Sequence, residues 1–376
     1  MEQAEFAVIG RGLIGAAAAR HLARAGRSVV LIGPEEPARK GDHGGPFGSH
    51  YDEGRITRAL DPDPFWSAAS RASIARYAEI EAQSGIPFFT EAGALVAGPE
   101  DGDFLARVRA VAEAGGLPHD VYGPEALAAR FPAFRFLPGT AGCHEPLRAG
   151  HISPRRLVAA QVESARRAGA RLMPHAALAI EETAQAVRVE TAGGAVSCVR
   201  LLVAAGGYSA SLLPGIAPVR VFARTVALFE VSEAQAAALA DMPALVLLEP
   251  SGRDPYLLPP IRYPDGRLYL KLGGDPADRP LRSAQEIGAW FRSGGDPQVG
   301  AYLRGWIERF MPGLEILSQR LDACMTSFSA DGQPILRRLS DRVAVATAGC
   351  GKGAKCSDEL GRLGAALVSG ERAQNA

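Results

Sequence analysis

The sequence predicts an α/β fold with two parts: a Rossmann-like parallel sheet covered by helices, and a second α+β domain built on an antiparallel sheet. Three observations lead to this prediction. A strand, a glycine turn, a helix and a strand follow one another at residues 5–33, and a second strand–glycine–helix unit lies at residues 342–370. Between them, residues 219–272 contain strand-like segments separated by turns, as in an antiparallel sheet.

The first unit carries three glycines with the spacing GxGxxG. Residues 6–9 form a short apolar run, which is typical of a strand buried on both faces. Gly10 then permits a tight turn, Gly12 lets the backbone approach a pyrophosphate, and Gly15 lets the following helix pack closely on the strand. Alone, the spacing would also suit a glycine-rich turn of another α/β fold, but between two strands it indicates a dinucleotide site.

The helix that follows is predicted to run from residue 13 to residue 25. It has good helix formers, no proline, and Gly26 to end it. Its first N–H groups and the positive end of its dipole would face the phosphates, so Leu13 and Ile14 are expected at the cofactor. Residues 29–32 form the second buried strand.

The end of the second strand departs from the usual pattern. An acidic residue is expected there to bind the ribose hydroxyls, but the chain has Gly33 and Pro34, followed by Glu35 and Glu36. Two interpretations are open. In the first, Glu35 or Glu36 reaches back to the ribose. In the second, both carboxylates are solvated, and backbone groups and water bind the ribose.

The composition of the chain limits the partners and the cellular location that can be expected for the protein. Lys plus Arg equals Asp plus Glu at 41 each in 376 residues, which argues against nucleic acid or an anionic membrane as the main partner. No apolar run reaches the roughly 18 residues of a membrane span. The glycine motif starts at residue 10, which leaves no room for a signal peptide, and residues 371–376 carry no peroxisomal tripeptide. We expect a cytoplasmic protein.

The cysteines point to reduced thiols and to no metal site. Their number, five, is odd, and their spacing does not match a zinc pattern. A cysteine with a role in this chain is therefore expected to have a chemical one.

The rest of the chain alternates helical and strand-like patterns. Helices are predicted at residues 64–84, 101–115, 124–130, 154–168 and 285–310, the fourth with Ser153 as N-cap. Strands are predicted at residues 86–98 (two, around a turn), 171–182, 186–190, 200–208, 219–231, 244–248, 256–259, 267–272 and 342–347. The cofactor domain is expected to comprise residues 1–85, 150–217 and 325–376, and the substrate domain residues 86–149 and 218–324.

A glycine-rich loop after residue 37 concentrates candidate site residues. Arg55 and Arg58 are three residues apart, so they would share a face if they lay in the first turn of a helix. Two guanidinium groups near a bound cofactor could serve its phosphate or a substrate carboxylate. The alternative is a solvated basic turn paired with Asp52 and Glu53.

Four stretches, taken together, resemble a known family. They are VIGRGLIG at the start, SHYDEGRITR at residues 49–58, LYLKLGGD at residues 268–275, and DACMTSFSADGQPIL with AGCGKGAK near the end. In order and spacing, over nearly the whole length, the chain is similar to the flavin-dependent amine oxidases of the sarcosine oxidase and N-methyltryptophan oxidase group, within the D-amino-acid oxidase superfamily. The glycine motif alone would allow NAD, and the resemblance selects FAD.

The resemblance implies roles for two residues in particular. Cys324 matches the cysteine that carries the flavin through a thioether to its 8α-methyl carbon; the alternative is a small buried core cysteine. Lys271 matches the lysine that sits over the flavin and activates oxygen, where a cation stabilises superoxide-like charge. The alternative is a strand lysine that extends to solvent.

Further roles follow from the same resemblance. Arg58 and Lys355 match the pair that binds the substrate carboxylate, Arg55 matches a catalytic arginine close to the flavin ring, and Tyr256 matches a catalytic tyrosine of the substrate pocket. Gly353 belongs to the turn that passes the flavin pyrimidine edge. The remaining expected cofactor contacts are Ser49, His50, Leu178, Ala205, Gly206, Gly351 and, again, Arg55 and Lys355. Ala205 and Gly206 are expected because the strand predicted at residues 200–208 runs into paired glycines, which allow a close backbone approach.

Three departures put sarcosine itself in doubt. Gly274 or Asp275 stands where the family often has a histidine, Thr326 stands where sarcosine oxidases have a tyrosine, and Lys352 replaces a common histidine. All three positions lie in or beside the implied substrate pocket.

The function implied is oxidation of an amino acid or another carboxylated amine, secondary or N-methylated, by FAD. Hydride transfer to flavin N5 would give an imine that hydrolyses, and reoxidation by O2 would give hydrogen peroxide. Three alternatives are kept. The first is a dehydrogenase or noncovalent D-amino-acid or glycine-type oxidase of the same fold, the second is a flavin-binding electron-relay subunit of a larger complex, and the third is a nicotinamide dehydrogenase, which would bind no flavin when purified. The expected partners are a small amine and O2, with the protein as a monomer or small homo-oligomer.

Overall fold

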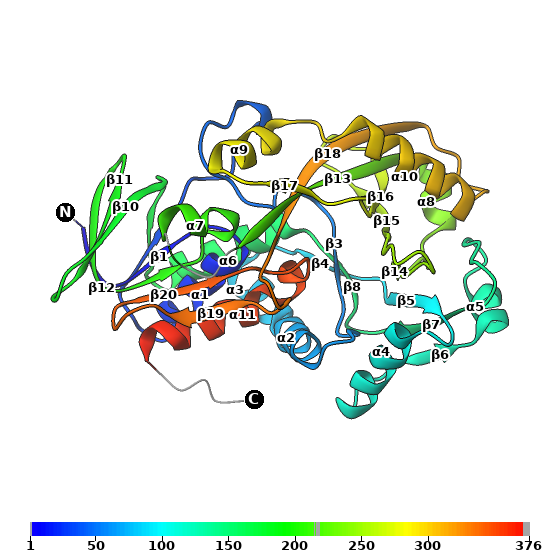
Figure 1. Cartoon of the computed structure of the whole chain (residues 1–376), viewed down its shortest axis with the longest axis horizontal. Helices are drawn as coiled ribbons and strands as arrows, with labels where there is room; N and C mark the ends of the chain where they lie inside the picture. The colour runs from blue at the N-terminus through cyan, green and yellow to red at the C-terminus, as the bar shows by residue number, and fades with distance from the viewer. Residues whose placement is uncertain (1, 214, 216–218, 371–376) are drawn as a thin grey trace.

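The computed structural model describes residues 2–213, 215 and 219–370, and places two large sheets side by side (Figure 1). The domain boundary expected at residues 217 and 218 lies outside the described residues. The fold is the α/β architecture with a second, mainly antiparallel sheet that the sequence predicts.

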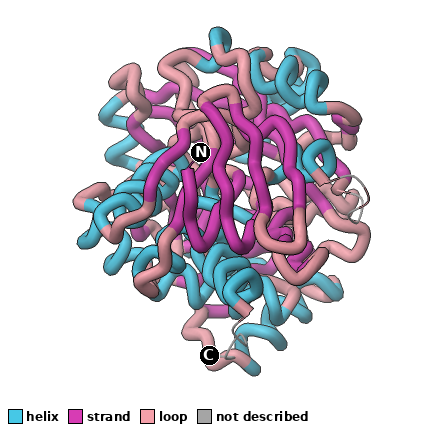
Figure 2. Tube along the Cα trace, turned by 90° about the vertical axis from the view of Figure 1, so that its left-hand side faces the viewer, coloured by secondary structure: helices cyan, strands magenta, loops and turns pink. Residues whose placement is uncertain are grey.

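The first sheet has eight strands and a parallel centre. β1 pairs in parallel with β2 and β12, β12 with β20, and β2 with β9, whereas β10, β11 and β12 are antiparallel neighbours, as are β19 and β20. Its strands are β1 Glu2–Ile9, β2 Val29–Ile32, β9 Arg171–Met173, β10 Ala177–Glu182, β11 Val187–Thr191, β12 Gly194–Val203, β19 Ile335–Arg338 and β20 Val343–Thr347. Figure 2 shows the end of the molecule that carries β10–β12, with strands side by side and helices around them.

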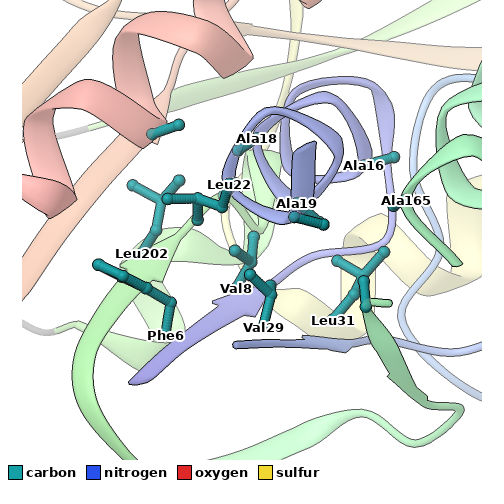
Figure 3. Close-up of a cluster of buried hydrophobic side chains, with 14 of the residues drawn as sticks. Phe6, Val8, Ala16, Ala18, Ala19, Leu22, Val29, Leu31, Ala165 and Leu202 are labelled. Carbon is teal, nitrogen blue, oxygen red and sulfur yellow. The ribbon is translucent and has the colours of Figure 1, made fainter. Parts of the chain in front are cut away.

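Helices pack closely on this sheet because small residues face it. α1 (Leu13–Arg24) buries four consecutive alanines, and Figure 3 shows Ala19 and Leu22 over Val8 and Val29 of the strands, with Ala16 beside Ala165. α11 (Gly353–Ser369) crosses α1 so closely that a Cβ on its Gly361 would lie 2.4 Å from the Ala17 Cβ. α6 (Pro154–Arg167) begins as predicted, with Ser153 Oγ accepting from the Arg156 N–H.

The second sheet has nine strands and is antiparallel except for the β14–β5 pair. The order is β17-β13-β16-β15-β14-β5-β7-β6, with β18 on the free side of β13. The strands are β5 Ala94–Pro99, β6 Asp120–Tyr122, β7 Thr140–Glu145, β13 Arg220–Val231, β14 Ala244–Leu247, β15 Tyr256–Arg262, β16 Leu268–Gly273, β17 Arg279–Leu281 and β18 Ser318–Phe328. β14, β15 and β16 form the predicted meander, but β13 joins it beside β16, and β18 had no counterpart among the predicted strands.

A small sheet connects the two large ones. β8 (Gly150–Ile152) pairs with β3 (Arg55–Thr57) and with β4 (Phe89–Glu91). The strands predicted at residues 86–98 therefore do not form a hairpin, because β4 belongs to the small sheet and β5 to the second large sheet. The other helices are α2 Pro64–Ala75, α3 Tyr77–Ser84, α4 Asp103–Ala114, α5 Pro124–Arg130, α7 Ser209–Leu212, α8 Glu233–Ala238, α9 Ala284–Arg292 and α10 Pro297–Phe310.

Four predicted elements are divided or shortened. The helix predicted at residues 64–84 is divided at Arg76 into α2 and α3. Residues 171–182 form two strands at opposite edges of the first sheet, because Pro174 cannot continue the ladder after β9. The helix predicted at residues 285–310 is interrupted at Gly295, whose φ is +85°, and restarts at Pro297. The strand predicted to reach residue 208 ends at Val203, before a short 3-10 turn.

Candidate active site

A cavity of about 710 Å³ opens at the carboxyl ends of the parallel strands. Ile9, Ile32, Ala204 and Thr347, at or just after the ends of β1, β2, β12 and β20, all line it. In open α/β sheets, ligands bind in this crevice. The expected cofactor residues that line it are Gly10, Gly12, Leu13, Ile14, Ser49, His50, Arg55, Leu178, Ala205, Gly206, Cys324, Gly351 and Gly353.

Glycine is required at two positions of the first turn. Gly10 has a φ of +111°, and a Cβ there would lie 2.2 Å from the Ala204 carbonyl oxygen. A Cβ on Gly15 would lie 1.8 Å from the Gly10 oxygen, so Gly15 serves helix packing, as predicted, and does not itself line the cavity. Both approaches are backbone contacts that a side chain would prevent.

The N-terminus of α1 presents its free N–H groups to the cavity. Its N-cap, Gly12, supplies no side-chain hydrogen bond, and the first turn contains no acidic residue. The positive end of the helix dipole is therefore uncompensated, which favours an anion such as a phosphate. Nearby, burial, with Arg155 and Arg55, lowers the pKa of His50 to about 3, so this histidine is neutral at pH 7.

Neither Glu35 nor Glu36 lines the cavity. Arg11 occupies the space above Gly33, where a Cβ would lie 2.7 Å from the Arg11 nitrogen. The same Arg11 pairs with the exposed Glu35 at 3.3 Å, and Glu36 binds Arg155. The geometry favours the interpretation in which both carboxylates stay outside, and Glu35 as a ribose ligand stays a prediction.

Cys324 lies on the cavity wall beside Arg55. The guanidinium Nη2 of Arg55 is 3.0 Å from the Cys324 sulfur and donates to the Ser49 carbonyl at 2.9 Å. Cys324 comes from β18, and Arg55 from β3, so residues 269 positions apart are in contact. Positive charge is thus held next to a sulfur that faces the cavity.

Lys271 is completely buried, which excludes the alternative of a lysine that extends to solvent. Its ammonium donates to the Asp52 carboxylate and, at 2.6 Å, to the Gly54 carbonyl. Burial and the nearby Arg55 lower the pKa of Lys271 to about 8, although Asp52 acts in the opposite direction. Despite its burial, Asp52 keeps a pKa of about 2 because of Lys271 and Arg55.

Tyr256 lies next to this pair. Its ring centroid is 5.6 Å from the Lys271 ammonium, and it occupies the space over Gly273, where a Cβ would lie 2.4 Å from the ring. Burial raises the pKa of Tyr256 well above its usual value, so the phenol keeps its proton. Lys271 and Tyr256 do not line the 710 Å³ cavity themselves, whereas Arg55 and Cys324, whose charges act on both groups, do.

Arg58 and Lys355 meet at a carboxylate that the sequence prediction missed. Asp61 accepts from Lys352 at 2.7 Å and from Lys355 at 3.0 Å, and Arg58 Nη1 lies 3.7 Å away. The Asp61 side chain has no exposed surface. Burial opposes ionisation, but Lys355, Arg58 and Lys352 hold the pKa of Asp61 well below its usual range.

Arg55 and Arg58 therefore serve different clusters. The idea that they share a helix face is wrong, because Arg55 begins a strand and side chains alternate along an extended chain. The alternative of a solvated turn is wrong as well, because both arginines are largely buried, at 17% and 9% side-chain exposure. The available signal was a carboxylate three residues from each arginine: Asp52 before Arg55, and Asp61 after Arg58.

Comparison with known proteins identifies the family. A family model described as FAD dependent oxidoreductase matches residues 5–367. The chain belongs to the FAD dependent oxidoreductase family. N-methyl-L-tryptophan oxidase from Yersinia pestis is 27% identical over 369 residues, which cover 96% of this chain and 94% of the relative.

Solved structures share the fold of this FAD-dependent oxidoreductase. NikD, an amino acid oxidase of nikkomycin biosynthesis, has a TM-score of 0.78 at 20% identity, covering all of this chain and 96% of NikD. Glycine oxidase from Bacillus cereus has a TM-score of 0.72 at 18% identity, with 98% and 96% covered. L-proline dehydrogenase from P. horikoshii has a TM-score of 0.76 at 16% identity, with 99% and 95% covered.

Proposed function

We propose that this protein oxidises a carboxylated amine, secondary or N-methylated, at the carbon next to nitrogen, and passes the electrons to O2. The observation that carries the proposal is a chain of partly buried groups that starts at the cavity wall and ends at the fully buried Lys271: Cys324 contacts Arg55, Arg55 pairs with Asp52 at 3.4 Å, and Asp52 binds Lys271. The relatives named above, an N-methyl-L-tryptophan oxidase and glycine oxidase, are supporting cases of oxidation at a C–N bond.

The cavity fits FAD. Its volume lies within the roughly 300–1,000 Å³ usual for ligand sites. The uncapped start of α1, with Gly12, would hold the pyrophosphate, and the turn at Gly351 and Gly353 would supply backbone N–H groups to the ring system. When bound, FAD accepts a hydride from the substrate at flavin N5. Cys324 is proposed to hold it covalently, by a thioether.

The protein's own groups orient the substrate and supply charge. Arg58 is proposed to bind the substrate carboxylate, with Lys355 beside it, because its Nε and Nη1 atoms are buried without an acceptor. Tyr256 would close the pocket next to Lys271. The Lys271 ammonium provides the positive charge that favours electron transfer to O2, which yields hydrogen peroxide, while the imine product hydrolyses in water.

A dehydrogenase that passes electrons to another acceptor is the second candidate. Asp52 already pairs with Lys271, so part of the positive charge expected near the oxygen site is compensated. The fold likeness to an L-proline dehydrogenase is compatible with this alternative. An electron-relay subunit, the third candidate, would not be reduced by any amine on its own.

A substrate screen tests the proposal. N-methyl amino acids, cyclic imino acids and glycated amines are offered to the purified protein, and flavin bleaching without air and peroxide release in air are measured. Bleaching with peroxide release is expected for at least one carboxylated amine. Bleaching without peroxide would establish the dehydrogenase instead, and absence of bleaching with every amine would contradict the oxidation proposal.

Acid precipitation tests the covalent link. We expect the yellow colour to stay with the precipitated wild-type protein and to move to the supernatant for Cys324→Ser. Colour in the supernatant for both proteins would contradict the thioether.

Helix length and overall charge bear on the partners and the location of the protein. In the part of the chain that the structure describes, no helix is long and apolar enough to cross a membrane. We propose small-molecule partners only, without nucleic acid or membrane, a cytoplasmic location, and a monomer or small homo-oligomer. The domain division at residues 1–85, 150–217 and 325–376 against 86–149 and 218–324 likewise stays a prediction.

A further inference from the structure

The charged groups around Asp61 do not share their hydrogen bonds evenly. Lys352 and Lys355 bind the two oxygens of Asp61, and Lys355 also approaches the Arg58 carbonyl oxygen at 3.4 Å. Arg58 is 8% exposed, and its Nε and Nη1 atoms have no acceptor within hydrogen-bond distance among the described residues. A buried guanidinium without an acceptor is costly, so the missing anion belongs next to Arg58 rather than Lys355.

The backbone around Asp61 is fixed from a second element. Glu145, at the end of β7, accepts from the N–H groups of Ala59 (2.9 Å) and Leu60 (3.0 Å), which separate Arg58 from Asp61. Asp61 itself also accepts from the Asp63 N–H at 3.2 Å. Hydrogen bonds therefore fix the backbone next to Asp61 and both of its carboxylate oxygens, so that Asp61 is a fixed part of the site.

The net charge of the cluster suits one carboxylate. Arg58, Lys352 and Lys355 contribute three positive charges. Burial raises the pKa of Glu145, but the N–H groups of Ala59 and Leu60 and the nearby Arg58 and Lys355 favour its carboxylate form. Counted as carboxylates, Asp61 and Glu145 contribute two negative charges, which leaves one positive charge. A monoanion next to Arg58 would neutralise the cluster, whereas a dianion would leave a buried negative charge in excess.

We propose that Asp61 is a specificity-determining residue that withdraws Lys355 from the substrate site. Arg58 alone then binds the carboxylate, and the protein selects amines with one carboxylate over amines with two. This inference rests on the proposed function, because it takes a carboxylated amine as the substrate.

Binding of simple carboxylates to the flavin-loaded protein tests the idea. Acetate and malonate are the probes, and their dissociation constants are measured from the change in flavin absorbance. Asp61→Asn frees Lys355 and adds one positive charge, so the affinity for malonate relative to acetate should rise by about tenfold or more. Asp322→Asn is the matched control, because it makes the same charge change at a carboxylate that pairs with Lys40 instead; it should leave the ratio unaltered.

Two further variants keep the test decisive if Asp61→Asn does not fold. In the otherwise wild-type protein, Arg58→Met should weaken acetate binding by about 30-fold or more, and Lys355→Met by no more than about threefold. Equal losses would overturn the role of Asp61, as would an unaltered malonate-to-acetate ratio in folded Asp61→Asn. If acetate does not bind the wild type, or binds Arg58→Met equally well, the carboxylate part of the proposed function fails, and this inference fails with it.

Discussion

At the scale of single residues, the site depends on charges that are buried in matched sets. Lys271 is surrounded by Asp52 and Arg55, and Lys355 by Asp61 and Arg58, so that each ammonium has one close carboxylate. Removing one member of such a set leaves the other buried and uncompensated. The same groups therefore determine stability and chemistry together.

Lys271 is expected to act mainly in the reaction with oxygen. Lys271→Met should slow flavin reoxidation by about 10²-fold, because the positive charge near the oxygen site is lost, and should slow flavin reduction far less. Stopped-flow measurement of the two half-reactions separates them. Lys40→Met, which removes a different partly buried cation, should change neither much; equal slowing of both half-reactions in Lys271→Met would remove Lys271 from this role.

The pKa of Lys271 predicts two pH effects. In the wild type, reoxidation should slow as the pH rises through about 8, because the ammonium loses its proton. Below about pH 8 the folded protein buries a charged ammonium, which lowers the free energy of unfolding. Between about pH 8 and the unperturbed pKa near 10.5, Lys271 is neutral in the folded state but still charged in the unfolded state, so the free energy of unfolding rises with pH. Unfolding titrations should therefore show the wild type gaining stability relative to Lys271→Met over this range. A constant difference would contradict the lowered pKa.

Gly15 is expected to be irreplaceable for packing. Gly15→Ala places a methyl group where the Gly10 carbonyl oxygen lies, so α1 must move away from β1. We expect a loss of about 1–3 kcal/mol in the free energy of unfolding and weaker retention of FAD, measured by denaturant titration and flavin absorbance. Gly313→Ala is the control, because nothing lies within 4 Å of its Cβ position. Similar stability of the two variants would contradict the close approach of Gly15 to the Gly10 carbonyl.

At the scale of elements, one carboxylate on α11 joins α11 to three other segments around the first sheet. Asp358 accepts from Arg20 of α1 at 2.9 Å, from Gln161 of α6 at 2.9 Å, and from Arg76, between α2 and α3, at 2.5 Å. It has no exposed surface, and although burial opposes ionisation, His21, Arg20 and Arg76 hold its pKa well below the usual range. The helices that cover the first sheet are thus held together by charge as well as by apolar packing.

Asp358→Asn should destabilise the protein by about 3–5 kcal/mol, because Arg20 and Arg76 would lose their common partner. Since the pKa is depressed in the folded state, the contribution is present above the unfolded pKa of about 4 and is lost as the pH falls below it. Guanidinium unfolding at several pH values measures both effects. Glu163→Gln, which removes a partly exposed carboxylate paired with Arg166, should leave the unfolding midpoint unaltered. An equally small change for Asp358→Asn would contradict the proposed role of Asp358.

At the scale of the whole molecule, the cavity is assembled from segments spread over nearly the entire chain. Gly10 and Arg55 come from the first part, Ala205 from the middle, and Cys324 and Gly353 from the last part. No single segment could form it, so FAD should bind the folded chain only and stabilise the parts jointly.

Loss of the covalent link makes this stabilisation measurable. Cys324→Ser, stripped of flavin, should gain about 2.7 kcal/mol of stability when FAD is added at 100 times its dissociation constant. Thermal unfolding with increasing FAD gives the value, and NAD added in the same way serves as the control. An unchanged melting temperature with FAD would contradict binding in this cavity.

The local units and the cofactor fold could be predicted from the sequence. The GxGxxG turn, the helix that it starts, the N-cap at Ser153 and most strands are consequences of residues close together in the chain, so their patterns could be recognised directly. The resemblance added residues that share one cavity wall, such as Cys324 and Arg55.

The partners of those residues became known only from the three-dimensional arrangement. β18 was not predicted, yet it carries Cys324 to the cavity, because its full-length pairing with β13 is a contact between distant segments. From the sequence, Asp52 was considered only as a partner in a solvated turn, and Asp61 was not singled out. Their importance comes from Lys271 and Lys355, which lie more than 200 residues away along the chain. A local sequence pattern shows which secondary structure a segment prefers and which of its residues are buried. The pairing of charges from distant strands depends on strand register and on packing, and no single stretch of the sequence determines these.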